Sequence, residues 1–354
     1  MYLDAEITGE SFDSIYNEIE INFQDQRYET VLQLCDVLLD KIIPSLQITE
    51  KELNQKLISV FYYKAESLVY TEELDDSIEY YAKAIELAEV LKDTESEIEL
   101  IFTYLEIVIQ NQLDREVDSY FQRISDLHSI KNDRTILSQW YSLKAGYTFN
   151  CELFEDTIKY CQLFERFNNS STDSQYILDV ATLNIRANNV LGKQKTALEL
   201  SKNAIEEFQL LLRTEKYCEL LVNHGLLEYN NNNAHEAILT LQKAYQISDE
   251  EGFSLCALNA LYTVGFVFFS NEQFEESLNI GIQFLARKDC ELITELISEV
   301  IVFVGVSFVK LERWAECKQF IEKHLQNQES SYYFSVVEKL QLLQKMVDAQ
   351  LSLE

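Results

Sequence analysis

Histidines are the first candidates for catalysis or metal binding in this sequence, and their spacing argues against both. Acid–base catalysis and metal coordination each need two or more such side chains close together in space. His224 and His235 lie on opposite sides of a predicted turn, and His128 and His324 are far from both along the chain. The histidines therefore predict no metal site.

Catalytic signatures are also missing from the sequence. It has no phosphate-binding G-x-x-x-x-G-K-[ST] loop, no dinucleotide-binding G-x-G-x-x-G pattern and no G-x-S-x-G nucleophile elbow. The acidic cluster Glu95, Glu97 and Glu99 is interpreted as a solvated helix start, because carboxylates favour the first turn of a helix. We predict no catalytic residues and no cofactor. An enzyme whose site forms only on folding is kept as a third alternative.

The cysteines indicate a reducing environment. There are seven of them, widely scattered, with no C-x-x-C pair. We expect reduced, mostly buried thiols. The first residues, MYLDAEITGE, have neither the basic segment nor the apolar segment of a secretory signal. The sequence therefore predicts a cytoplasmic protein.

Composition restricts both the fold and the partners. Only 8 Gly and 1 Pro in 354 residues leave little turn chemistry for a sheet protein, so the expected fold is all-α. The net charge of −31 repels phosphate backbones and anionic lipid headgroups, which predicts no nucleic acid and no membrane as partner. The same charge favours a partner of basic character, and a homodimer is a further assembly compatible with the sequence.

The longest apolar segment, VIVFVGVSFVKL (300–311), belongs to a repeat. It is too short to span a bilayer, which needs about 20 apolar residues. Instead it aligns without gaps with the earlier segments 260–271 and 220–231, which places Gly225, Gly265 and Gly305 in one column. A second column of mostly small residues has the same spacing: Thr157, Ala197, Ala237, Ser277 and Cys317. Ser77 and Glu116 extend this column with small shifts.

Both columns repeat with a period of 40, which predicts a stack of helix pairs. Two helices of about 15 residues and their turns fit into this length, with small residues where the first helix (helix A) crosses the second (helix B). We predict one array over residues 12–330, after a tail at 1–11 and before a capping helix at 331–354. The predicted units lie near 12–45, 55–92, 97–130, 136–168, 176–212, 216–250, 255–288 and 292–328.

The pattern resembles the tetratricopeptide repeat (TPR). The family's order is a small residue, an aromatic residue and then helix B, and it is followed here by Gly265, two phenylalanines, Phe274 and Leu278. The segment SIEYYAKAIELAEVLKD (77–93) resembles the second helix of the family's repeat. The period of 40 rather than 34 and the missing terminal proline depart from the family pattern. The resemblance implies a right-handed α-solenoid superhelix of seven to eight helix pairs.

A weaker resemblance is to the bacterial receptors for secreted signalling peptides, the Rap, Rgg and PlcR group. The shared feature is an array of roughly forty-residue units that ends in a helical cap. The basic DNA-binding domain of the transcription factors in that group has no counterpart here, because residues 1–60 hold only four basic side chains. The three-helix bundle of the Rap phosphatases is also not recognisable. Any regulatory action is therefore expected to pass through protein contacts.

Helix A of each TPR-like unit lines a concave groove, and this resemblance identifies candidate binding residues. Side-chain amides can hold a ligand backbone, aromatic rings can form pockets, and a lone arginine can hold a carboxylate. The candidates are Phe149, Arg186, Asn189, Asn223, Tyr229, Asn259, Phe266 and Phe269. Two alternatives stay open: the phenylalanines pack between repeats, and Arg186 is neutralised by Asp179 or Glu219. The tetrad Asn230 to Asn233 is interpreted as a tolerant turn.

Two functions follow from this sequence. The first is a non-enzymatic scaffold or sensor that captures a peptide or protein segment in its groove and regulates a partner protein. The second is a rigid adaptor that bridges two proteins without a small peptide ligand, for which a basic partner surface would provide the attraction.

Overall fold

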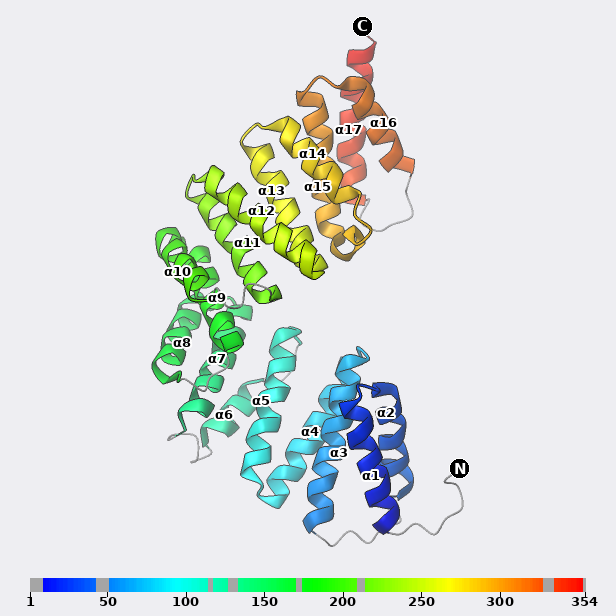
Figure 1. Cartoon of the computed structure of the whole chain (residues 1–354), viewed down its shortest axis with the longest axis vertical. Helices are drawn as coiled ribbons and strands as arrows, with labels where there is room; N and C mark the ends of the chain where they lie inside the picture. The colour runs from blue at the N-terminus through cyan, green and yellow to red at the C-terminus, as the bar shows by residue number, and fades with distance from the viewer. Residues whose placement is uncertain are drawn as a thin grey trace. The chain divides into compact units, whose positions relative to one another are not determined.

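The chain forms helices throughout the residues that the structure describes. This computed structural model describes residues 9–42, 51–113, 117–126, 133–169, 174–208, 214–326 and 334–352, and it holds no strand within them. The predicted all-α class is confirmed (Figure 1). The helices are α1 (Gly9–Gln24), α2 (Tyr28–Val37), α3 (Lys51–Tyr70), α4 (Leu74–Leu91), α5 (Thr94–Gln110), α6 (Val117–Asp126), α7 (Arg134–Asn150), α8 (Phe154–Phe167), α9 (Ser174–Val190), α10 (Gln194–Glu207), α11 (Glu215–Asn230), α12 (Ala234–Glu251), α13 (Ser254–Ser270), α14 (Phe274–Leu285), α15 (Thr294–Lys310), α16 (Trp314–Gln326) and α17 (Phe334–Leu351).

The turns between helix A and helix B keep the period found in the sequence. One residue in each turn has a positive φ, in the left-handed region that caps many helices. In the turn between α1 and α2 this residue is Gln26, and in the later turns, at intervals of 40, the residues are Glu72, Gln112, Glu152, Gly192, Asn232, Glu272 and Glu312. In the turn after α11, the N–H of Asn233 donates to the carbonyl of Glu228 over 2.9 Å, which closes the end of the helix. The predicted turn at the asparagine tetrad is confirmed, and Asn tolerates this backbone conformation well.

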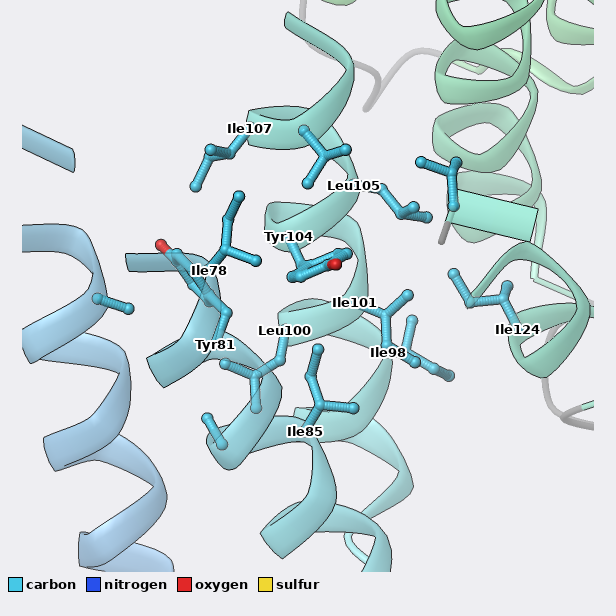
Figure 2. Packing of buried hydrophobic residues seen from close by; sticks show 14 of the residues in the cluster. Ile78, Tyr81, Ile85, Ile98, Leu100, Ile101, Tyr104, Leu105, Ile107 and Ile124 are labelled. Atoms are coloured by element: carbon cyan, nitrogen blue, oxygen red, sulfur yellow. The ribbon is translucent and has the colours of Figure 1, made fainter. Parts of the chain in front are cut away.

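The chain divides into two compact units. Unit 1 comprises residues 1–153 with 162–172, and unit 2 comprises residues 154–161 with 173–354. In unit 1, buried side chains of α4, α5 and α6 form a continuous core, which includes Tyr81, Ile101 and Ile124 (Figure 2). A single repeat array over residues 12–330 stays a prediction.

The small residues predicted from the sequence lie where the helices of a pair cross. Ser77, Thr157, Ala197, Ala237, Ser277 and Cys317 are all fully buried. In the pair α13–α14 the Ser277 hydroxyl donates to the carbonyl of Gly265 over 3.0 Å, and in the next pair the Cys317 thiol donates to the carbonyl of Gly305 over 3.6 Å. The two predicted columns therefore meet each other in space. Glu116 of the second column lies outside the described residues.

The last helix covers the end of unit 2. Helix α17 packs against α15 and α16, and its buried residues Val336, Leu340 and Val347 join the core of those helices. Lys318 of α16 and Asp348 of α17 form an ion pair at 2.8 Å. Helix α17 therefore occupies the position that the next helix A would take. Residues 1–8 of the predicted tail 1–11 lie outside the described residues.

Among the described residues, no helix is both long and apolar enough to cross a bilayer, and no group of three or more His, Cys, Asp or Glu could hold a metal ion. Five of the seven cysteines are buried, and none of the seven forms a disulfide. The apolar segment 300–311 lies in α15, where Val300, Ile301 and Val304 are fully buried in the core of unit 2.

Gly225 gives a direct test of this packing. A Cβ at this position would lie 2.5 Å from Cγ of Leu241, so Gly225→Ala should lower the free energy of unfolding by about 1–2 kcal/mol despite its better helix propensity. Urea unfolding followed by circular dichroism measures the change. Gly305→Ala is the matched control, because its Cβ would approach only the flexible Cδ1 of Leu343, at 2.9 Å. Equal stability of Gly225→Ala and wild type would contradict the close helix crossing.

Candidate functional site

One face of each helix A in unit 2 is not covered by other helices. Each helix A packs against its own helix B and against the neighbouring helices A, as α11 does with α9, α12 and α13. The uncovered residues of α13 follow helical spacing: Leu255, Asn259 and Phe266 are exposed, and Tyr262 and Phe269 are half-buried. The corresponding faces of α9, α11, α13 and α15 are called here the A-face of unit 2.

Seven of the eight predicted binding residues belong to unit 2. Arg186, Asn259 and Phe266 are exposed on the A-face, and four others are half-buried there: Asn189, Asn223, Tyr229 and Phe269. Phe149 lies near the end of α7 in unit 1, where it is half-buried. These seven residues lie on the successive A helices α9, α11 and α13. Their role in binding stays a prediction.

Three aromatic rings meet on the A-face of unit 2. Phe266, 37% exposed, lies edge-on to Tyr229, with 6.0 Å between ring centroids, and is stacked on Tyr262 at 6.3 Å. The rings come from α11 and α13, so the cluster bridges two repeats. Exposed aromatic rings of this kind provide contact area with few rotatable bonds, which is typical of binding hot spots.

A further aromatic residue of the A-face, Phe269, packs against rings of the neighbouring helices. Phe269 lies 5.8 Å from Phe274 and 6.0 Å from Phe303, measured between ring centroids, which joins α13 to α14 and α15. The interpretation of Phe269 as an inter-repeat packing residue is therefore supported. Phe303 was not identified from the sequence, and neither was Tyr262. A signal for Tyr262 was present, because it follows Asn259 by three residues and precedes Phe266 by four.

The amides of the A-face have unused hydrogen-bonding capacity. Asn189, Asn223 and Asn259 come from the consecutive A helices α9, α11 and α13. None of their side-chain amides is bonded to another residue in the part of the chain that the structure describes. Each amide offers both donors and an acceptor, the combination that a peptide backbone requires.

Acidic side chains form a column along the same face. Asp179, Glu219 and Glu299 occupy the same position of their repeats, and Asn259 takes that position in the repeat between the last two. Tyr262 donates a hydrogen bond from its hydroxyl to Glu299, and burial together with this carboxylate raises the pKa of Tyr262. Each of these carboxylates adds negative charge to the A-face, which Lys216 and Arg186 partly offset beside Asp179 and Glu219.

Arg186 lies within electrostatic reach of this acidic column. Asp179, one of its two predicted neighbours, is paired with Lys216 at 3.3 Å. The other predicted neighbour is Glu219, whose side chain is partly exposed. Loss of hydration is the main effect that raises the pKa of Glu219. The positive charges of Lys216 and, more weakly, of Arg186 lower this pKa. The alternative that a nearby carboxylate neutralises Arg186 therefore has support at Glu219.

His224 lies close to the side chains of Ser201 and Glu228. Its Nδ1 lies 2.8 Å from the Ser201 hydroxyl, and its Nε2 lies 3.6 Å from Glu228. A serine, a histidine and a carboxylate can act together in acyl transfer, but the serine must be accessible to substrate. Ser201 has no exposed surface, and its hydroxyl is 3.0 Å from the carbonyl of Leu198. This group therefore links α10 to α11, and burial lowers the pKa of His224.

Comparisons with known proteins identify the fold. No protein-family model matches the sequence, and no curated protein matches it. Solved structures do match, and those described below are 11–13% identical to this chain, which shows the fold alone. The structure is similar to that of a signal transduction ATPase with a tetratricopeptide repeat sensor from Pyrococcus horikoshii, with TM-score 0.63 and 12% identity. That match covers 90% of this chain and 49% of the other, so this chain spans about half of that protein.

Two further matches extend over nearly the whole of both chains. A Rap protein complexed with competence and sporulation factor has TM-score 0.51 and 11% identity, covering 97% of this chain and 100% of the other. Aspartyl phosphate phosphatase F from Bacillus subtilis has TM-score 0.54 and 13% identity, covering 98% and 95%. The predicted resemblance to TPR proteins, including Rap proteins, is confirmed for the fold.

The charge balance at Glu219 can be tested directly. Because Arg186 favours the ionised carboxylate, Arg186→Met should raise the pKa of Glu219 further, measured by NMR titration of its side-chain carboxyl carbon. Lys216→Met should raise it more, since Lys216 has the larger effect. An unchanged pKa in Arg186→Met would show that Arg186 does not act on Glu219.

Proposed function

We propose that the chain is a non-enzymatic TPR-like binding protein that captures a peptide or protein segment on the A-face of unit 2 and thereby regulates a partner protein. The observation that carries the proposal is the combination, on one uncovered face, of three unbonded amides, the Tyr229–Tyr262–Phe266 ring cluster and a column of carboxylates. Seven cysteines without a disulfide support a cytoplasmic location.

The chemistry of the A-face suggests how a ligand would be held. The amides of Asn189, Asn223 and Asn259 would bond the ligand backbone, and the rings of Tyr229 and Phe266 would take up a side chain. The acidic column would attract a segment with basic residues and speed its encounter at low salt. A Rap protein of similar fold has been crystallised with competence and sporulation factor, which supports a peptide-sized ligand for this fold.

The second candidate is an adaptor that joins two proteins without a small ligand. The net charge of −31 favours it, because a strongly acidic surface attracts a basic protein surface. The two candidates differ in where the binding energy lies. A peptide sensor depends on the desolvated centre of the A-face, whereas an adaptor depends on exposed charges, including those on helices B.

To test peptide capture, the protein is incubated with spent medium and lysate of its own organism at physiological salt. The molecules that it retains are identified by mass spectrometry, and calorimetry with the synthetic peptide then measures the affinity. Asn189→Ala and Tyr229→Ala should each weaken peptide binding by about 2 kcal/mol or more if they are hot spots. Glu236→Lys, a charge reversal at an exposed position of α12, is the control and should change it little.

The opposite pattern would support the adaptor. In that case only folded proteins would be retained, their binding would fall with Glu236→Lys and with added salt, and Asn189→Ala would have no effect. The proposed binding residues on the A-face would then be wrong.

A further inference from the structure

Unit 1 has an uncovered face of its own with a different chemistry. In the register of the repeat, the position of Arg186 and Phe266 in unit 2 is occupied in unit 1 by Glu66 and Glu106. Around Glu66, the helices α1, α3 and α5 carry tyrosines and further glutamates. The surface formed by Glu20, Tyr62, Glu66, Tyr70 and Glu99 is called here the tyrosine–glutamate face.

Hydrogen bonds from tyrosines hold two of its carboxylates in place. Glu20 of α1 accepts from the hydroxyls of Tyr16, at 3.0 Å, and Tyr63, at 3.4 Å. Glu66 of α3 accepts from the hydroxyl of Tyr81, whose ring belongs to the core of unit 1 (Figure 2). Burial raises the pKa of the Glu66 carboxyl. The carboxylates are thus fixed by the fold and are partly dehydrated.

No cation within the described residues neutralises these carboxylates. Glu20, Glu66 and Glu99 form no ion pair in the part of the chain that the structure describes. Two lysines of α3 form ion pairs with aspartates outside this face: Lys56 with Asp13 at 2.9 Å, and Lys64 with Asp36. A partly dehydrated carboxylate without a counter-charge is energetically unfavourable, so a cationic partner would gain more here than at a fully hydrated acidic surface.

Aromatic rings lie next to the unpaired carboxylates. Tyr70, 60% exposed, stacks on Tyr28 with 4.2 Å between ring centroids. Tyr62 lies edge-on to Tyr81 at 6.3 Å, and burial and then the charge of Glu66 raise the pKa of Tyr62 to about 12, with a smaller contribution from Glu99. These effects show that Tyr62 lies within electrostatic reach of glutamates on both α3 and α5. Exposed ring faces beside carboxylates bind ammonium and guanidinium groups through cation–π contacts and charged hydrogen bonds.

The charge distribution of the sequence agrees with a cationic partner. Residues 9–113 contain 23 acidic and 7 basic residues, a net charge of −16, which is about half of the −31 of the whole chain in less than a third of its length. A field of this strength accelerates association with a positively charged protein. It also repels nucleic acid and anionic lipid, which leaves polypeptide as the macromolecular cation.

We propose that the tyrosine–glutamate face of unit 1 binds a lysine- and arginine-bearing segment of a partner protein. This surface is separate from the A-face of unit 2, and the proposal does not depend on a ligand there. Lysine or arginine side chains of the segment would pair with Glu20, Glu66 and Glu99 and lie against the rings of Tyr62 and Tyr70. The protein would then have two binding surfaces, one in each unit.

The test uses calorimetry of the full-length protein with a synthetic peptide of alternating arginine and alanine at about 0.15 M salt. The triple variant Glu20→Gln, Glu66→Gln, Glu99→Gln keeps hydrogen-bond acceptors for the tyrosines and should weaken binding at least about tenfold. The matched control, Glu72→Gln, Asp76→Asn, Glu86→Gln, changes the net charge equally at exposed positions outside the face. It should weaken binding by less than about threefold.

Two further variants locate the site. Tyr62→Leu with Tyr70→Leu should weaken binding without any change in charge, whereas Leu239→Ala, at an exposed position of α12 outside both faces, should leave it unchanged. Circular dichroism confirms that each variant is folded. Equal losses in both triple variants, a loss in Leu239→Ala, or no binding by the wild type would overturn the proposal. All of these variants lie outside the A-face of unit 2, so a failure of this proposal leaves the proposed capture by Asn189 and Tyr229 to its own test.

Discussion

The close crossing of helix A over helix B is the constraint on which the rest of the structure depends. Where Gly225 faces Leu241 there is no room for a Cβ, and the hydroxyl of Ser277 reaches the carbonyl of Gly265 across the same crossing in its own pair. Such contacts fix the distance and the rotation between the two helices of a pair. Since they recur from one repeat to the next, successive A helices present the same side chain positions to the same side.

This geometry separates stability from binding. The small and apolar residues of the repeat are buried where the helices pack. In each A–B turn a residue with positive φ, such as Glu272, reverses the chain at the same point of the repeat. The remaining face of each helix A is then free to vary in chemistry. In unit 2 this face of helix A carries amides, an aromatic cluster and one arginine. In unit 1 it carries glutamates and tyrosines. One scaffold thus carries two faces of different composition.

The sequence alone predicted the helical repeat and the face that carries the candidate site. Gly225, Gly265 and Gly305 were informative because a mid-helix glycine at a fixed period has a packing cause, and Asn232 was informative because asparagine tolerates a positive φ. The roles of single residues were harder to predict. Phe269 packs while Phe266 stays exposed, although both are phenylalanines on one helix, and periodicity alone does not distinguish them. The tyrosine–glutamate face was missed because its hydrogen bonds join residues far apart in sequence, such as Glu20 and Tyr63.

Ligand binding on the A-face of unit 2 can be mapped by hydroxyl-radical footprinting with mass spectrometry, with and without a saturating bound peptide. If the A-face holds the ligand as proposed, the peptide should protect Tyr229, Tyr262 and Phe266 from oxidation. Leu239 and Ile282, which are exposed on α12 and α14, should keep their oxidation rates. Protection of Leu239 and Ile282 with unchanged oxidation of the three aromatic residues would contradict it.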